Sequence, residues 1–276
     1  MGIEPGYSDK IATEIEKTTT NRSKSSRKNR RRNRKMAAVQ TLFNVCKEVF
    51  ADGGVGFIPC PDDVERLRSI LNSLTQDDVG LSPELPYFRP IRIGNSRAPI
   101  ITYLHLYECD KFSIGIFCLP PSGVLPLHNH PGMTVFSKLL FGTMHIKSYD
   151  WVEGDPYTTA VSENAPPARL AKLTVNEDFV APCNTSILYP AAGGNMHCFT
   201  AMTACAVLDV LGPPYSDPDG RHCTYYREYP FDRFSADGIS GLEQEKDRLA
   251  WLQDREKPRS LTVFGASYRG PRIVDG

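Results

Sequence analysis

The chain contains 276 residues, of which 41% are hydrophobic, and its 32 Lys and Arg residues balance 32 Asp and Glu residues. This length and composition are typical of a globular protein with one large domain or two small ones. They argue against a membrane-spanning protein, because no apolar run approaches the roughly 20 residues that cross a bilayer. The N-terminus shows neither the apolar core of a secretory signal nor the pattern for myristoylation. We therefore expect no membrane association, eight free cysteine thiols and a location in the nucleus and cytoplasm.

The balanced net charge conceals two oppositely charged parts. Residues 1–36 carry 11 Lys and Arg against 4 Asp and Glu, whereas the remaining 240 residues carry 21 against 28. The polar composition predicts a disordered basic arm over residues 1–36, followed by one folded domain over residues 37–276. Nine of the fourteen residues of Arg22–Lys35 are basic, as in a nuclear-import signal, a nucleic-acid-attracting arm or a merely solvated tail. The chain has no helix-turn-helix, finger or basic-zipper pattern, so we expect no direct nucleic-acid binding.

Two helices are predicted directly after the arm. Apolar residues recur at helical spacing over Ala37–Phe50. They recur again on one face of a segment that opens at Asp62 and Asp63, where the carboxylates suit the positive end of a helix.

From about Ala98 the sequence changes to short runs rich in Val, Ile, Thr, Tyr and Phe, bounded by turn residues. The strands predicted from these runs are Ile100–Tyr107, Phe112–Leu119, Thr134–Phe141, Thr143–Asp150, Leu170–Asn176, Thr185–Tyr189 and Cys198–Leu211. Many short strands at this spacing predict a mainly β fold closed as a sandwich or barrel, which also removes exposed sheet edges. Near the C-terminus, Ile239, Leu242, Leu249 and Leu252 fit one face of a charged helix packed outside the barrel.

Three histidines form the most informative feature of the chain. His128 and His130 follow a turn rich in Gly and Pro, and His197 follows the run Gly193–Met196. Residues two apart on a strand point the same way, so a His-x-His pair can hold two adjacent positions on one metal. The segment after His130 offers no carboxylate, which argues against the two-histidine, one-carboxylate triad of many iron oxygenases. The sequence therefore predicts a metal site of three neutral histidines. The alternative interpretation is that all three histidines are packing residues.

Both histidine segments resemble the two cupin motifs. The first is Gly123-Val-Leu-Pro-Leu-His128-Asn-His130, and the second is Pro190-Ala-Ala-Gly193-Gly194-Asn-Met-His197. Ordinary cupins carry a glutamate four or five residues after the second histidine, where this chain has Thr134 and Val135. Loss of that carboxylate is a feature of the thiol dioxygenase branch of the cupins.

Within that branch, several further segments resemble the cysteamine dioxygenase group and the plant cysteine oxidases. They are Pro126–Met133, Val207–Tyr215 and His222–Arg227, and the resemblance extends from about Ala37 to Phe231. It implies a double-stranded β-helix (jelly-roll) barrel holding one Fe(II). The implied reaction adds both atoms of O₂ to the sulfur of an N-terminal cysteine. The implied substrates are proteins such as oxygen-labile transcription factors, which sulfinic acid formation marks for N-degron proteolysis during oxygen sensing and the hypoxia response.

The chemistry of the residues agrees with this reading in outline. Three neutral ligands leave the full charge of a divalent metal in place, and a nearby cation lowers the pKa of a thiol. By themselves, however, three histidines fit zinc as well as iron, because a similar set generates hydroxide in carbonic anhydrase.

Four further residues are candidates for the catalytic site. Asp209 lies in an otherwise apolar strand, so it either binds a backbone N–H or an arginine or orients the substrate amine or a water, as the resemblance suggests. Tyr215 either presents its hydroxyl to the pocket or covers the barrel edge. Cys223 and Tyr225 match the positions where cysteamine dioxygenase can form a thioether crosslink.

The other histidines and the arginines bear on the choice of substrate. His105 and His145 are predicted to be structural, and His222 is either near the site or on the surface. Free cysteine carries a carboxylate that normally requires a cationic clamp. The candidate clamps lie outside both motifs, and they are Arg89, Arg92, Arg221 and Arg227. We therefore expect a polypeptide N-terminus as the substrate, a rim over Gly212–Gly220 and a monomeric enzyme. The alternatives are a small-thiol dioxygenase and a catalytically silent nuclear cupin.

Overall fold

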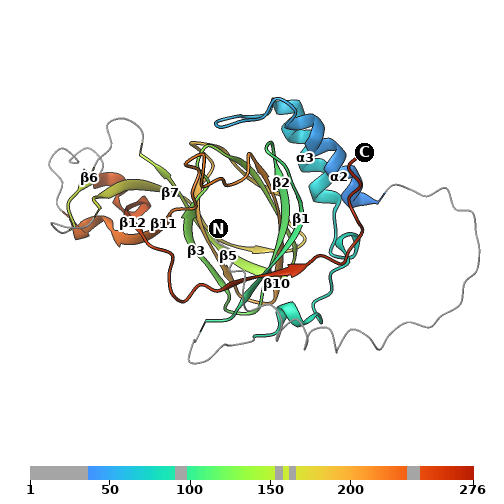
Figure 1. Cartoon of the computed structure of the whole chain (residues 1–276). Coiled ribbons are helices and arrows are strands. Elements are labelled where there is room, and N and C mark those ends of the chain that lie inside the picture. Colours follow the sequence, from blue (N-terminus) through green and yellow to red (C-terminus); the bar gives the residue numbers. More distant parts are fainter. Residues whose placement is uncertain (1–36, 91–97, 153–157, 162–165, 235–242) are drawn as a thin grey trace, which may run out of the picture.

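The computed structural model describes residues 37–90, 98–152, 158–161, 166–234 and 243–276, and its elements are arranged around a β-barrel (Figure 1). The predicted basic arm, Arg92 and Ile239 lie outside the described residues. Two helices come first, α2 (Ala38–Val49) and α3 (Pro61–Ser73), followed by the 3₁₀ turns η1 (Asp77–Val79) and η2 (Pro86–Phe88). None of the helices in the described ranges has the length and hydrophobicity needed to cross a membrane.

Two sheets face each other and enclose the barrel. The first has the strand order β13-β1-β2-β10-β4-β8, and the second has the order β12-β11-β3-β9-β5-β7-β6. The strands of the first sheet are β1 (Ile101–Glu108), β2 (Ser113–Leu119), β4 (Thr134–Phe141), β8 (Ser186–Leu188), β10 (Cys205–Gly212) and β13 (Val263–Ser267). The strands of the second are β3 (Val124–Asn129), β5 (Thr143–Trp151), β6 (Thr158–Thr159), β7 (Ala168–Val180), β9 (Met196–Ala201), β11 (Tyr225–Pro230) and β12 (Leu249–Arg255). This arrangement confirms the predicted mainly β barrel with helices at its N-terminal side.

The helices cover the outer face of the first sheet (Figure 1). Apolar residues of α2 at helical spacing, among them Leu42 and Phe43, are buried against Ile114, Ile116 and Leu208 of β2 and β10. Each such side chain stabilises the fold by about 1.5–3 kcal/mol. Because neighbouring residues of a strand point to opposite faces, the odd-numbered residues of β2 and β10 face the barrel interior. This double burial explains why these strands read as almost continuous apolar runs.

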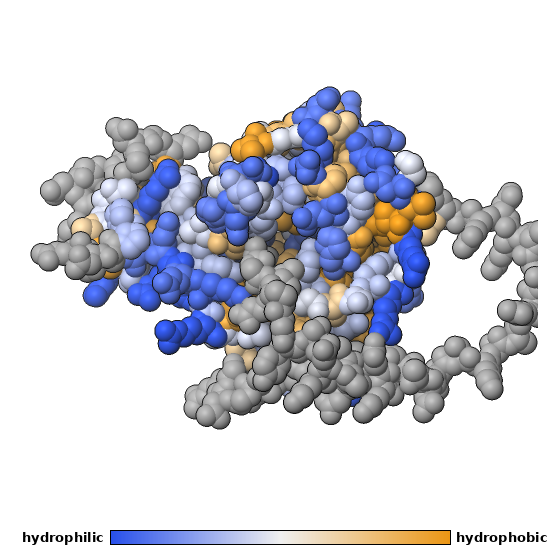
Figure 2. Space-filling view, viewed as in Figure 1, coloured by the Kyte–Doolittle hydropathy of each residue, from blue (hydrophilic) through white to orange (hydrophobic). Residues whose placement is uncertain are grey.

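The face of the molecule in Figure 2 is mostly hydrophilic, and the hydrophobic residues there form small separate areas. Large hydrophobic side chains that are exposed include Val55 and Ile58, on the connection between α2 and α3. All eight cysteines are unpaired in the structure.

Most predicted strands are present within two or three residues, and Thr134–Phe141 is reproduced as predicted. Two predictions were wrong. Cys198–Leu211 is not one strand, because a turn at residues 202–204 divides it into β9 and β10, which belong to different sheets. Leu249 and Leu252 lie on strand β12 and not on a helix. The helical part of this segment, within the described residues, is the 3₁₀ turn η4 (Glu243–Arg248). A further 3₁₀ turn, η3 (Phe231–Arg233), precedes the undescribed segment that includes Leu242.

The physical reason for the second error is that both faces of β12 are buried. The strand pairs with β11 at one edge and with β7 at the other, and its residues pack alternately into two apolar clusters, Ala250 and Leu252 into one and Leu249 and Trp251 into the other. A strand buried on both faces loses the alternation of apolar and polar residues, so the spacing of Leu249 and Leu252 imitates a helix.

Candidate metal centre and substrate pocket

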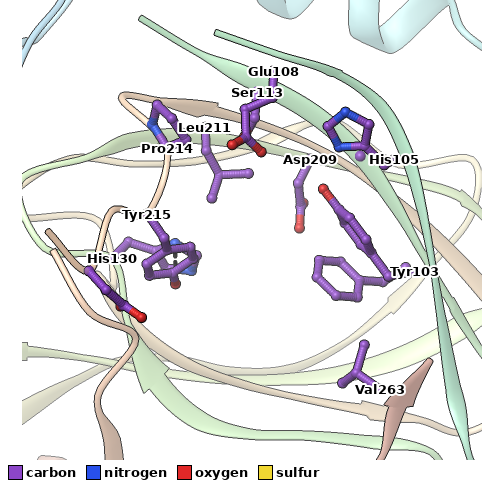
Figure 3. A pocket seen from close by; sticks show the side chains of 13 residues that line it. Tyr103, His105, Glu108, Ser113, His130, Asp209, Leu211, Pro214, Tyr215 and Val263 are labelled. Atoms are coloured by element: carbon purple, nitrogen blue, oxygen red, sulfur yellow. Dashed lines mark hydrogen bonds between the residues drawn. The ribbon is translucent and has the colours of Figure 1, made fainter. Parts of the chain in front are cut away.

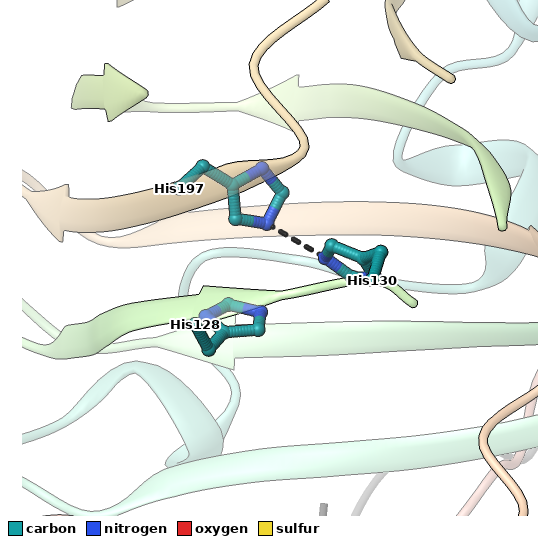
Figure 4. Close-up of side chains that lie close together, drawn as sticks. All are labelled: His128, His130 and His197. Atoms are coloured by element: carbon teal, nitrogen blue, oxygen red, sulfur yellow. Dashed lines mark hydrogen bonds between the residues drawn. The ribbon is translucent and has the colours of Figure 1, made fainter. Parts of the chain in front are cut away.

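The register of the second sheet brings the three predicted histidines together. His128 on β3 is the direct cross-strand partner of His197 on β9, and such partners point to the same face of a sheet. His130 follows one residue after the end of β3. The potential ligand atoms of the three rings lie within 4.8 Å of one another (Figure 4). All three side chains are buried, with 2%, 2% and 5% of the surface of His128, His130 and His197 exposed.

Hydrogen bonds at the far side of two rings fix their orientation. The Nδ1 atom of His128 lies 2.8 Å from the carbonyl oxygen of Pro126, to which it donates. The Nδ1 atom of His130 lies 3.0 Å from the hydroxyl of Tyr215, and that hydroxyl donates to the carbonyl oxygen of Asn129 at 2.7 Å. With a proton on each Nδ1, both rings present the lone pair of Nε2 to the centre of the site.

The geometry and the protonation states both fit a metal ion. The Nε2 atoms of His130 and His197 are 3.0 Å apart, and two imidazole nitrogens bound at right angles at about 2.1 Å from one ion would be about 3 Å apart. Burial lowers the pKa of His128 to about 4, and burial also lowers the pKa values of His130 and His197 well below their usual range. The rings are therefore neutral at pH 7, as metal ligation requires.

Asn195 connects the two histidine motifs. Its side-chain oxygen accepts the backbone N–H of His130 at 3.1 Å, and its amide donates to the carbonyl oxygens of His130 and Tyr189, both at 2.9 Å. The Asp150 carboxylate accepts the backbone N–H groups of Gly194 and Asn195 at 2.9–3.0 Å. Neither Asn195 nor Asp150 was predicted from the sequence, and only the position of Asn195 directly after Gly193 and Gly194 indicated such a role.

Gly194 allows this turn to approach the barrel closely. Its φ angle is +85°, and a Cβ atom there would lie 2.3 Å from the hydroxyl of Ser148. Any other residue at this position would have to displace β5 and would disturb the turn that delivers His197.

A cavity of about 380 Å³ leads from the surface to the metal centre. Its lining comes from segments far apart in the sequence, and it consists of Tyr103, His105, Glu108, Ser113, Gly115, Phe117, His130, Asp209, Leu211, Pro214, Tyr215, Asp217 and Val263. The cavity is in the range of small-ligand pockets and is larger than one free cysteine requires. Among the described residues no lysine or arginine lines it.

Asp209 faces the metal centre from the opposite sheet. On β10 it is the cross-strand partner of Gly115 on β2 and of Ser137 on β4. In Figure 3 its carboxylate points into the cavity beside the Tyr103 hydroxyl, with His130 and Tyr215 on the other side. Asp209 is 5% exposed, and its Oδ1 atom has no hydrogen-bond partner. Burial raises the pKa of Asp209 to about 7, an effect that Ser137 partly opposes.

The other three candidate residues lie beside the cavity in different ways. Tyr215 lines it, but its hydroxyl holds His130 in place and so acts through that ring. Tyr225 pairs with His128 across β11 and β3, and the two ring centroids are 6.3 Å apart. Cys223 lies near the hydroxyls of Tyr215 and Tyr225. The pKa values of both tyrosines are raised, mainly by burial and to a smaller extent by the neighbouring thiol of Cys223. Cys223 and Tyr225 thus border the centre from the side of His128 without lining the cavity.

The remaining histidines lie outside the cluster. His145 contacts Asp178 at 2.6 Å on the barrel surface, and His222 contacts Asp217 at 3.1 Å. His105, predicted to be structural, lies outside the three-histidine cluster, and it lines the cavity. Of the candidate carboxylate clamps, Arg221 contacts Asp219 and the carbonyl oxygen of Pro214, and Arg227 contacts Tyr229.

A family model described as PCO_ADO matches residues 70–273 of the chain. The chain belongs to the PCO_ADO family. This membership confirms the predicted relation to plant cysteine oxidases and the prediction of a thiol dioxygenase. Plant cysteine oxidase 2 of Arabidopsis thaliana is 56% identical over 284 residues, with 100% of both chains covered. Plant cysteine oxidase 1 of the same organism is 60% identical over 245 residues, with 87% of this chain and 82% of the relative covered.

More distant proteins are similar over smaller parts. The 2-aminoethanethiol dioxygenase of Homo sapiens is 29% identical over 230 residues, which cover 77% of this chain and 82% of that protein. A solved cupin superfamily protein from Desulfitobacterium hafniense aligns with a TM-score of 0.29 and 15% identity, covering 47% of this chain and 94% of its own.

Proposed function

We propose that this PCO_ADO protein uses Fe(II) and O₂ to oxidise the N-terminal cysteine of target proteins to cysteine sulfinic acid. The observation that carries this proposal is the cavity at the three histidines, which contains an unpartnered carboxylate and, among its described lining, no lysine or arginine. A free amino acid would place a carboxylate in that cavity with no cation to bind it. A peptide has a neutral amide at the same position, and its chain has room to leave through the cavity.

The choice of iron rests on the donor set together with the family. Three neutral imidazoles accept Fe(II) or zinc, but oxidation of a thiol by O₂ needs a metal that takes part in redox chemistry. Bound Fe(II) would supply that chemistry and would lower the pKa of the substrate thiol. In the balanced reaction R–SH and O₂ give R–SO₂H, so sulfur provides the electrons and both oxygen atoms enter the product.

The residues of the chain position the substrate and the ligands. The Asp209 carboxylate faces the cavity without a partner on Oδ1, so it is placed to accept the N–H groups of the substrate ammonium. That interaction would satisfy an atom that is costly to bury alone. Tyr215 holds His130, and Asn195 holds the backbone of the same residue, so the ligand set keeps its shape when the cavity fills.

We infer further that the enzyme works in oxygen sensing, in nucleus and cytoplasm, and marks oxygen-labile proteins for N-degron proteolysis. The plant cysteine oxidases at 56–60% identity support this inference. The basic segment Arg22–Lys35 would serve as the nuclear address. A monomer that accepts Cys-initiated proteins through the cavity mouth is the simplest form of such an enzyme.

Two other functions stay as competing proposals. A small-thiol dioxygenase is favoured by the human 2-aminoethanethiol dioxygenase, whose named substrate lacks a carboxylate and therefore also needs no cationic clamp. A catalytically silent metal-binding cupin would keep the three histidines without turnover.

The test is anaerobic loading of the full chain with Fe(II), followed by exposure to O₂ together with a Cys-initiated peptide. Mass spectrometry should show two added oxygen atoms, both derived from O₂ when isotopically labelled gas is used. A peptide with an acetylated N-terminus and a peptide that begins with Ser are the controls. A competition between peptide, cysteamine and free cysteine at equal concentrations distinguishes the two kinds of enzyme. Preferred oxidation of either small thiol contradicts the proposal. No oxidation of any thiol by iron-loaded protein would favour the silent cupin.

A further inference from the structure

A second and much smaller cavity borders the metal centre at His197. It encloses about 40 Å³ and shares no lining residue with the substrate cavity. Its lining consists of Val135, Ser137, Ile146, Ser148, Val175, Phe179, Ser186, Ile187, Leu188, Gly193, Gly194, His197 and Phe199. His197 therefore borders the small cavity, whereas His130 borders the large one.

The small cavity lies at the seam between the two sheets. Five strands line it: β4 and its edge partner β8 from the first sheet, and β7, β5 and β9, which are neighbours in the second. Within the described strands, β8 pairs only with β4, and no hydrogen-bond ladder joins it to β7. Side chains alone close the barrel here, so a gap can persist between them.

The walls of this seam cavity are mainly apolar. Seven of its lining residues have apolar side chains, none carries an ionised side chain at pH 7, and the ring of Phe199 lies against His197 with the centroids 4.2 Å apart. Gly193 and Gly194, at φ +82° and +85°, form one wall. A side chain at Gly194 would run into Ser148, so the glycine keeps this end of the cavity open.

We propose that the seam cavity is the binding and entry site for dioxygen. This inference rests on the proposed function, in which a peptide occupies the large cavity and obstructs that route to the metal centre. Small apolar cavities bind small apolar guests such as xenon, because no hydrogen bond is lost when such a guest enters. Dioxygen is apolar and small enough for a volume of about 40 Å³, whereas a peptide is excluded.

Water is the competing occupant. The Ser148 hydroxyl is buried without a hydrogen-bond partner, and Ser137 and Ser186 add two further hydroxyls to the lining. A water molecule held here would need two to four polar partners within reach. The apolar majority of the walls favours the gas, and the experiment separates the two occupants directly.

The first test is diffraction from crystals of the full chain pressurised with xenon, which serves as the probe for an apolar gas. We expect a xenon peak between Val175, Ile187 and His197, and a stronger peak in Val175→Ala, which enlarges the cavity. An ordered water without xenon, or no xenon at all, overturns the proposal. This measurement does not depend on turnover, so it stands even if the peptide is not a substrate.

The second test compares one substitution in each cavity. Val175→Phe fills the seam cavity and should raise the KM for O₂ about tenfold while the KM for the peptide changes less than about twofold. Val263→Phe makes the same change in the large cavity and should raise the KM for the peptide instead. Equal effects of Val175→Phe on both KM values, or no effect on the KM for O₂, contradict the assignment. Val175→Leu provides a smaller filling substitution should the phenylalanine variant fail to fold.

Discussion

Asp209→Asn is expected to abolish most turnover and, at the same time, to stabilise the metal-free protein. The substitution keeps the size of the side chain and removes its charge. In the folded protein the carboxylate is buried, its Oδ1 atom has no partner, and its pKa is raised to about 7 from an ordinary value of 3.8. A carboxyl group whose folded pKa is raised destabilises the fold as pH rises above its unfolded pKa, and the effect is complete above the folded pKa.

The size of the effect follows from that difference in pKa. One pKa unit corresponds to about 1.4 kcal/mol, so the shift from 3.8 to about 7 corresponds to roughly 4 kcal/mol when Asp209 is fully ionised. At pH 8 we therefore expect Asp209→Asn to raise the free energy of unfolding by about 2–4 kcal/mol, the lower bound allowing for relaxation around the charge. Near pH 4 the difference should almost vanish, because the wild-type group is then protonated in the folded protein.

The assay is urea-induced unfolding of both metal-free proteins at several pH values from 4 to 8. Peptide oxidation by the iron-loaded variant should fall about 10–100-fold in kcat/KM, because a hydrogen bond to a charged group contributes about 1.5–3 kcal/mol. Asp110→Asn, an exposed aspartate on the connection between β1 and β2, is the matched control and should change neither quantity. A variant that is less stable than wild type at pH 8, or equally active, would refute the reasoning, because Asp209 would then have a structural partner.

Three further predictions concern the ligand set and the arm. Tyr215→Phe removes the hydroxyl between His130 and Asn129 and should weaken metal binding about 10–100-fold; equal metal affinity by titration would show that the hydroxyl does not position the ring. Asn195→Leu removes three hydrogen bonds and should lower the free energy of unfolding by about 2–4 kcal/mol in denaturant titrations, and an unchanged value would contradict the connection of the two motifs. Deletion of residues 1–36 should leave peptide oxidation intact and reduce nuclear accumulation, and lost oxidation would assign the arm a catalytic role.

The local sequence determined the elements and the types of residue at the centre. Strand β4 was predictable to the residue, because Gly142 and the Pro131-Gly132 turn bound a run of β-forming side chains. The alternation of faces along an extended segment was enough to place His128 and His130 together, and the missing carboxylate after them defined the donor set. These features depend on the order of neighbouring residues, which the sequence states directly.

Only the tertiary structure decided how distant segments meet. His128 and His197 face the same side because β3 and β9 pair in one particular register, and Asp209 lies across the barrel because β10 belongs to the opposite sheet. The contacts of Asn195 with His130 span 65 positions of sequence, and β12 is a strand because β7 and β11 pair with it at its two edges. Pairing energy between strands depends on partners far away in the chain, so local patterns cannot specify it. The hydrogen bonds of Asn195, the seam cavity beside His197 and the surroundings of Asp209 therefore form only when the barrel closes.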